Sequence, residues 1–478
     1  MSTEQLTLEF FAPVFLYLLL LSLITVYAVR AGGSNAATAS GGQDYFLAGR
    51  GVGSILAFVS VVATETSVAT ILIFPQVGYG GGFALIWLCL GYIAGRWLVA
   101  AIYLGPLYEQ HRLSMYATVT NSALARRTLS AAYLVAKFIS SGVRFYMGGV
   151  AFGKLMGWEL APAILFIGII AGTYSLAGGL RAVILTDQLQ GYIILFMGLF
   201  LTASLFLQFD LSAMAAPAWV NLNPELSNAQ FFPALFFGGL VLSIGTHGAD
   251  QDMLQRVLAT KSLSIARRSL ILSGFGATAV ILTYLAVGVL LAAGASSGQI
   301  QGVHAETPLV DYINVLKNPW VAGSFAVLLV AAAMSTLDSA LHSTGAVWKS
   351  ILGRDTEDEG GGTRIYSFLS LVILILAAFG FSSASGYRNF LDLAMSFMNY
   401  VNGGLIGVFT LFITARRPLA FPAILAALLT GFVVTLLANT ALPIRPGWTY
   451  TTIVSAALAF AAAWAADRWS ARGPATRG

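Results

Sequence analysis

The sequence contains few charged residues and almost no cysteine. Only 9% of its 478 residues are charged and 58% are hydrophobic, whereas about 25% of the residues in a soluble protein are charged. This composition predicts a membrane protein. The single cysteine, Cys89, lies in an apolar run, which excludes a disulfide framework and a cysteine-based metal site.

Histidine is also scarce, and the usual enzyme motifs are missing. The four histidines are scattered without the spacing of metal ligands: His111, His247, His304 and His342. The sequence shows no nucleophile–base constellation and no nucleotide-binding loop, which argues against an intramembrane enzyme and a primary pump. The excess of Lys and Arg, 25 against 20 acidic residues, is expected to reflect membrane topology rather than nucleic-acid binding.

Long apolar stretches run along the whole chain. Thirteen of them are long enough to span a bilayer, at residues 10–29, 54–77, 83–108, 128–155, 159–179, 183–208, 230–250, 269–296, 321–352, 364–384, 388–413, 418–441 and 447–468. No small-residue cleavage pattern follows the first stretch, so we expect a retained helix rather than a signal peptide. The sequence therefore predicts an all-α integral membrane protein with about thirteen transmembrane helices in a single domain, residues 1–478.

The distribution of basic residues predicts the orientation. If the first helix runs from outside to inside, most Lys and Arg residues fall in inner loops, and the outer side holds only Lys154, Lys317, Arg388 and Arg445. Cytoplasmic loops are enriched in Lys and Arg. We therefore expect an external N-terminus and a cytoplasmic C-terminus in a bacterial-type inner membrane.

One predicted helix carries polar residues on a single face. Counting from Ser335 as position i, the residues Asp338, Ser339, His342 and Ser343 fall at i+3, i+4, i+7 and i+8, which places all five on one face. Polar groups at membrane depth are costly unless they face protein, water or an ion. Oxygen donors suit a hard cation such as Na⁺. A polar seam between two helices is the alternative, and we favour an ion site.

Two predicted spans are interrupted by polar residues, at 63–67 in the second span and at 245–248 in the seventh. Interruptions at matching places in two sets of five helices indicate an inverted-repeat transporter with its site at the midplane. The predicted units are an extra N-terminal helix at 9–30, a first repeat at 54–208, a second repeat at 230–413 and two C-terminal helices at 418–468.

Three motifs occur in the order found in the sodium:solute symporter family. They are Asp44–Arg50 ahead of residues 63–67, the Gly-Gly and Thr-Asp-x-x-Gln elements within Gly178–Gly191, and residues 250–256 combined with 331–343. The chain resembles this solute carrier 5-like family over nearly its whole length. The resemblance implies a LeuT-type fold and Na⁺-driven solute uptake.

The resemblance also implies a shared sodium site. In such transporters two carbonyls of the first core helix, with one carbonyl and two hydroxyls of the eighth, bind Na⁺. The matching positions in this chain are Ala63, Thr66, Ala332, Ser335 and Thr336. A break in the helix at Ala63–Thr66 would leave carbonyls available that a continuous helix would use.

Some family members hold a second Na⁺. The matching positions in this chain are Asp187, Ser335, Asp338 and Ser339. Asp338 stands where a hydroxyl is expected, so it could strengthen ion binding by its charge, carry a proton or pair with a cation. We expect one Na⁺ and leave the second open.

The substrate region offers two interpretations. Glu65 and Arg144, both at membrane depth, could pair with each other, or Arg144 could clamp a substrate carboxylate. The second interpretation resembles the substrate arginine of sialic-acid-transporting members. Where sugar transporters have a tyrosine gate and a tryptophan, this chain has Thr246 and His247, which argues against a galactose-type pocket. The candidate substrate-binding residues are Thr64, Glu65, Ser67, Thr70, Arg144, Ser243, Thr246 and His247.

The predicted function is secondary active transport, in which inward Na⁺ movement drives uptake of a small polar organic solute. A carboxylate-bearing solute, such as a sialic-acid-like or other organic anion, is preferred. The alternatives are a Na⁺/sugar or Na⁺/amino-acid symporter, and less strongly a passive channel or a sensor. A channel would need a continuous polar pore, whereas the polar residues of this chain cluster at the midplane. We expect a monomer that contacts solute and membrane lipid.

Overall fold

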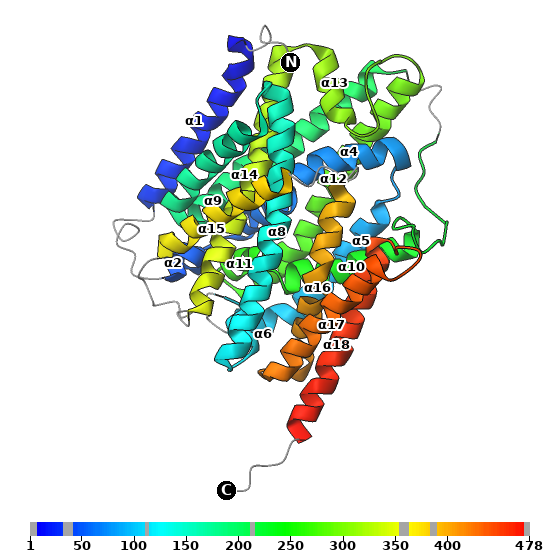
Figure 1. The fold of residues 1–478 in the computed structure, drawn as a ribbon. Helices are drawn as coiled ribbons and strands as arrows, with labels where there is room; N and C mark the ends of the chain where they lie inside the picture. The colour runs from blue at the N-terminus through cyan, green and yellow to red at the C-terminus, as the bar shows by residue number, and fades with distance from the viewer. Residues whose placement is uncertain are drawn as a thin grey trace.

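A computed structural model describes residues 7–31, 42–109, 114–210, 216–352, 363–382 and 390–472. Of the residues named above, His111 and Arg388 lie outside these ranges. The described chain is almost entirely helical, and its β-structure is one isolated bridge between Val52 and Thr260. Its long helices pack into one bundle (Figure 1). The structure confirms the prediction of an all-α membrane protein.

Helices of very different lengths follow one another along the described chain. In chain order the α-helices are α1 (Leu8–Ala31), α2 (Gly42–Leu47), α3 (Ser54–Glu65), α4 (Val68–Gly81), α5 (Ile86–Leu98), α6 (Leu104–Tyr108), α7 (Tyr116–Val119), α8 (Ala123–Met156), α9 (Leu160–Gln208), α10 (Phe232–Gly248), α11 (Gln251–Leu258), α12 (Leu263–Ser296), α13 (Pro308–Leu316), α14 (Pro319–Ile351), α15 (Thr363–Ser382), α16 (Phe390–Ala415), α17 (Phe421–Thr440) and α18 (Trp448–Arg472).

The number of spans is lower than the sequence predicts when only long apolar helices of the described chain are counted. Nine helices meet that criterion, or up to eleven when each of two bent pairs counts as one span. One of the nine, α9, has 49 residues and covers two of the predicted spans. A straight helix of that length would measure about 74 Å, more than twice the hydrocarbon thickness. It bends at Gly179, whose φ of 62° and ψ of −167° are not helical. Thirteen spans therefore remain a prediction.

Both predicted interruptions are true helix breaks. The axes of α3 and α4 differ by 63° across the break after Glu65, and those of α10 and α11 differ by 60° across the break after Gly248. Ser67 begins α4 as its N-cap, and its side chain accepts a hydrogen bond from the Ala69 amide. Since the last carbonyls of a helix have no partner within it, each break exposes backbone groups at the middle of the bundle.

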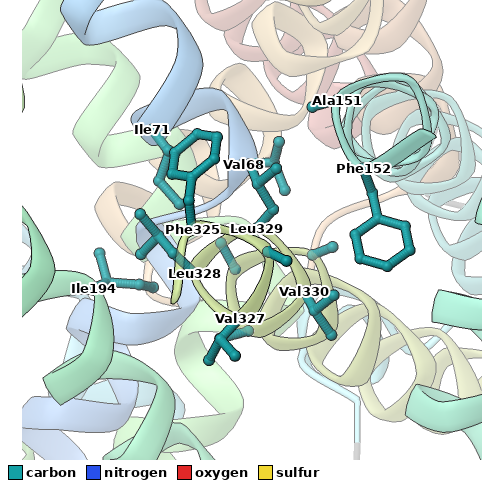
Figure 2. Close-up of a cluster of buried hydrophobic side chains, with 14 of the residues drawn as sticks. Val68, Ile71, Ala151, Phe152, Ile194, Phe325, Val327, Leu328, Leu329 and Val330 are labelled. Atoms are coloured by element: carbon teal, nitrogen blue, oxygen red, sulfur yellow. The ribbon is translucent and has the colours of Figure 1, made fainter. Parts of the chain in front are cut away.

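Helix α14 is the buried centre of the bundle. Every residue from Phe325 to Val347 is buried. Figure 2 shows Ile71 of α4, Phe152 of α8 and Ile194 of α9 arranged around its apolar half. In a membrane, helices associate through close packing and interhelical hydrogen bonds rather than through a difference in apolarity. Helix α14 therefore serves as the scaffold that the broken helix packs against.

The outer helices flank this centre on two sides. Helix α1 packs against α9 and α14, and α16, α17 and α18 contact one another at the other side of the bundle (Figure 1). Helix α18 also contacts α10. The residues at the breaks themselves, such as Thr66, Ser67 and Ala249, are buried, whereas Ile55 of α3 and Phe237 of α10 are exposed.

Glycines allow α4 and α12 to pack at very short range. A Cβ atom added at Gly288 of α12 would lie 2.0 Å from the carbonyl oxygen of Pro75, and one added at Gly78 of α4 would lie 2.2 Å from the carbonyl oxygen of Leu285. Small residues at membrane helix interfaces permit this kind of backbone contact. The contact fixes α4 relative to α12.

We predict that Gly288→Ala lowers the stability of the protein by about 1–3 kcal/mol, because the Pro75 backbone must move to admit the methyl group. The matched control is Gly80→Ala in α4, where nothing lies within 4 Å of the added Cβ and alanine is the better helix former. Thermal unfolding of both variants in detergent tests this. Equal losses in the two variants would contradict the packing argument.

Candidate functional site at the helix breaks

The predicted sodium ligands meet where the α3–α4 break faces α14. Thr66, just after α3, has the extended dihedrals φ −83° and ψ 107°. The Ser335 hydroxyl of α14 donates a 2.8 Å hydrogen bond to the Ala63 carbonyl, while the Thr336 hydroxyl donates over 3.3 Å to the Ala332 carbonyl in its own helix. All five residues are buried. The structure therefore places backbone and hydroxyl oxygens from two helices side by side.

A second group of polar residues surrounds a buried guanidinium. Arg256 of α11 forms an ion pair with Asp187 of α9, with 3.2 Å between Nη2 and Oδ2, and donates a 2.5 Å hydrogen bond to the Ser339 hydroxyl. The Ser60 hydroxyl donates to the same Asp187 oxygen over 2.5 Å, and the Ser335 hydroxyl lies 3.5 Å from the other oxygen. Arg256 thus bridges two residues of the predicted second ion site.

Asp338 takes part in a different network. Its carboxylate accepts a hydrogen bond from the Tyr174 hydroxyl of α9, and that hydroxyl lies 3.2 Å from the side-chain nitrogen of Gln190. The other Asp338 oxygen has no hydrogen-bond partner within the described chain. Among the described residues Asp338 shares no hydrogen bond with Asp187 or Ser339, unlike the grouping that the sequence predicts.

A cavity of about 160 Å³ lies beside the α3–α4 break. Its wall includes five of the predicted substrate residues: Glu65, Ser67, Thr70, Arg144 and Thr246. The remaining three are buried but do not line the cavity: Thr64, Ser243 and His247. A smaller cavity of about 30 Å³ adjoins it, since both are lined by Lys137, Ser140 and Asp250.

Glu65 pairs with Arg96 of α5. The interpretation that Glu65 pairs with Arg144 is therefore wrong for this structure. The Nε2 atom of His247 in α10 lies 4.0 Å from Glu65 Oε2, beyond hydrogen-bond distance, and its Nδ1 atom lies 3.0 Å from the Ser243 carbonyl oxygen. Arg96 is not among the residues predicted from the sequence, where its only signal was that it is a lone basic residue inside a predicted span.

Lys137 of α8 forms ion pairs with carboxylates at the second break, as Arg96 does at the first. Its Nζ atom lies 3.1 Å from Asp250 Oδ2 and 2.5 Å from Asp252 Oδ2. Both aspartates lie where α10 gives way to α11, and the Asp250 side chain caps α11 by accepting from the Asp252 amide. A sequence signal for this pair existed, because two carboxylates follow a polar interruption at membrane depth.

Arg144 is the exception among the cations of the cavity wall. The described lining has three: Arg96, Lys137 and Arg144. The first two have carboxylate partners, whereas Arg144 forms no ion pair or hydrogen bond with any residue that the structure describes. It lies seven residues, about two helical turns, beyond Lys137. Its charge acts on the Glu65 carboxylate from beyond ion-pair distance, and a half-buried guanidinium without a direct ion pair favours an anion in the cavity.

Comparison with known proteins identifies the family of this chain. The model of the sodium:solute symporter family matches residues 45–429. The chain belongs to this family. As a family member it is a Na⁺-coupled membrane transporter and not an enzyme, which confirms the resemblance seen in the motifs.

Curated relatives of this symporter have different solutes. It is 25% identical to the rabbit (Oryctolagus cuniculus) sodium-dependent multivitamin transporter, covering 86% of this chain and 69% of that protein. It is 25% identical to the sodium/glucose cotransporter of Vibrio parahaemolyticus, covering 77% and 74%, and 24% identical to human sodium-coupled monocarboxylate transporter 1, covering 88% and 71%.

Solved structures show the same fold. A Na⁺-coupled sialic acid symporter in a substrate-bound outward-open state matches with a TM-score of 0.81 and 20% identity, over 97% of this chain and 98% of that one. The nucleobase-cation-symport-1 transporter Mhp1 matches with a TM-score of 0.56 and 16% identity, over 90% and 95%.

We predict that Arg96→Met destabilises the symporter by about 3–5 kcal/mol, because it leaves the Glu65 carboxylate buried without its partner. The double variant Glu65→Gln with Arg96→Met should regain a large part of this loss, since neither charge then remains. Thermal unfolding of the two single variants and the double variant forms the required cycle. Additive losses would show that the two side chains do not interact.

Proposed function

We propose that this symporter couples the inward movement of one Na⁺ to the uptake of a carboxylate-bearing solute. The observation that carries the proposal is Arg144, a cavity-lining cation without a carboxylate partner beside the α3–α4 break. A planar guanidinium matches a carboxylate in bidentate geometry. The solute would bind in the central cavity, and the repeats at 54–208 and 230–413 would rock around it in alternating access.

The proposed Na⁺ ligands are the carbonyls of Ala63, Thr66 and Ala332 and the hydroxyls of Ser335 and Thr336. The hydrogen bond from the Ser335 hydroxyl to the Ala63 carbonyl supports this set, because it places an oxygen ligand of α3 next to one of α14. Na⁺ would link the broken helix to the scaffold helix. Na⁺ and solute would then favour the same conformation, so each would raise the affinity for the other.

We propose one ion rather than two because Arg256 already supplies the positive charge at the second site. Its guanidinium contacts both Asp187 and Ser339, two of the four residues in the predicted second set. A Na⁺ at this place would be repelled by a cation bonded to the same oxygens. Asp338, the third member, faces Tyr174.

The ion pairs of the cavity also bear on the alternatives. An amino acid needs an acceptor for its ammonium group, and the Glu65 carboxylate is engaged by Arg96 while Asp250 is engaged by Lys137. A sugar has no charge to match Arg144. Two similar proteins are a sialic acid symporter and a monocarboxylate transporter, and their solutes support an organic anion as the solute of this chain. The proposed topology is an external N-terminus and a cytoplasmic C-terminus in a bacterial-type inner membrane, as a monomer.

We predict that Ser335→Ala and Thr336→Ala each raise the Na⁺ concentration required for half-maximal uptake about tenfold, which corresponds to about 1.4 kcal/mol per lost ligand. The matched control is Ser343→Ala on the same buried face, whose hydroxyl donates to the Ala340 carbonyl of its own helix. Uptake by reconstituted protein at varied Na⁺ tests this. An unchanged Na⁺ requirement in both variants would rule out the assigned ligands.

We predict that Arg144→Gln abolishes the stabilisation of the symporter by carboxylates while its stabilisation by Na⁺ persists. A ligand that binds the folded state raises the unfolding temperature by mass action, so both effects can be read in one thermal assay in K⁺ and in Na⁺. Retained Na⁺ stabilisation also shows that the variant is folded. Carboxylate binding equal to that of the unmodified protein would contradict the proposed role of Arg144.

A further inference from the structure

The central cavity has two chemically different sides. Its charged side consists of Glu65, Arg96, Lys137, Arg144 and Asp250. A second group of lining residues is apolar, and we call it the apolar wall: Phe74, Leu85, Leu88, Ile281 and Trp448. The lining of one cavity therefore offers contacts both for a charged group and for an apolar group. A solute that has a charged part and an apolar part would match it.

The apolar wall is one continuous cluster and not a set of isolated contacts. Its residues come from four helices, α4, α5, α12 and α18, with Leu85 at the start of α5, and all belong to the same hydrophobic cluster. Leu242 of α10 extends this cluster along the same cavity. A continuous apolar surface facing a cavity stabilises an apolar ligand in proportion to the area that the ligand removes from water.

The hydroxyls of the cavity are largely engaged within the protein. The Thr66 hydroxyl donates to the carbonyls of Val62 and Ala63, and the Ser140 hydroxyl donates to the Lys137 carbonyl. Ser67 and Thr70 accept hydrogen bonds from backbone amides at the start of α4. These bonds use the hydroxyl protons of Thr66 and Ser140, so a solute with many hydroxyls would meet fewer hydroxyl donors in this part of the cavity.

We propose that the solute is an amphipathic monocarboxylate, with its carboxylate at Arg144 and a predominantly apolar body against the apolar wall. This inference rests on the proposed function and adds the nature of the body of the solute. The cavity, with a volume of about 160 Å³, is similar in size to an apolar cavity of about 150 Å³ that binds benzene, so it admits a small apolar body. We expect polyhydroxylated acids and uncharged sugars to bind more weakly than such a solute.

The test measures binding to the purified full-length symporter in saturating Na⁺ with a matched set of ligands. Acetate, butyrate and hexanoate vary the apolar body at constant charge, gluconate keeps six carbons but adds hydroxyls, and hexanamide removes the charge. We expect about tenfold tighter binding for each two methylene groups added. Gluconate and hexanamide should each bind at least tenfold more weakly than hexanoate.

Variants of the apolar wall test the location. Phe74→Ala and Ile281→Ala should weaken hexanoate binding about tenfold and leave acetate within about twofold, because acetate has no body to reach the wall. The matched control is Leu282→Ala, since Leu282 packs on the same cluster but does not line the cavity. Its hexanoate affinity should not change. Stabilisation by Na⁺ alone verifies that each variant is folded.

The outcomes separate this inference from the proposed function. If gluconate binds as tightly as hexanoate and Arg144→Gln abolishes the binding of both, the carboxylate site at Arg144 is supported. The inference that the body of the solute is apolar is then wrong. If hexanamide binds as tightly as hexanoate, the role of Arg144 in the proposed function fails. An absence of hexanoate binding, or equal weakening by Leu282→Ala, overturns the inference as stated.

Discussion

The structure depends on one physical constraint, the need to satisfy backbone groups where a helix stops inside a membrane. At the α3–α4 break, the Ala63 carbonyl receives the Ser335 hydroxyl of α14, and the Ser67 side chain caps the start of α4. No water is present in the bilayer core to perform either task. The break is therefore satisfied partly by α14 and partly by its own residues, since the Thr66 hydroxyl also donates to the Ala63 carbonyl. The Ala63 carbonyl and the Ser335 hydroxyl belong to the proposed ion site.

Charge balance in the bundle follows from the same constraint. Burying an ionised side chain is expensive unless a partner neutralises it. Glu65 pairs with Arg96, Asp187 with Arg256, and Asp250 with Lys137. These pairs join α3 to α5, α9 to α11, and the second break to α8. Arg144 departs from this pattern at the cavity wall, because no ion pair of its guanidinium is found among the described residues, whereas Lys137 has two carboxylates, Asp250 and Asp252.

Helix α14 links packing to function. Its first half packs through apolar side chains against α4, α8 and α9 (Figure 2), and its second half presents hydroxyls and a carboxylate to the polar groups of α3 and α9. The glycine contacts between α4 and α12 hold the other half of the broken helix. A shift of α14 would therefore change the proposed ion ligands, whereas the described lining of the cavity comes from other helices.

The sequence alone determined the membrane class, the all-α architecture, the family and both helix breaks, because long apolar runs and polar interruptions are local patterns. It also placed Ser335 and Ala63 in one site, which the tertiary structure brings within 2.8 Å. Partner choice was decided only in three dimensions. Glu65 lies 31 residues along the chain from its partner Arg96. On one face of α14, Ser339 accepts a hydrogen bond from Arg256, whereas the neighbouring Asp338 accepts one from Tyr174. No local pattern encodes which neighbouring helix faces each side chain, so these pairings follow from packing.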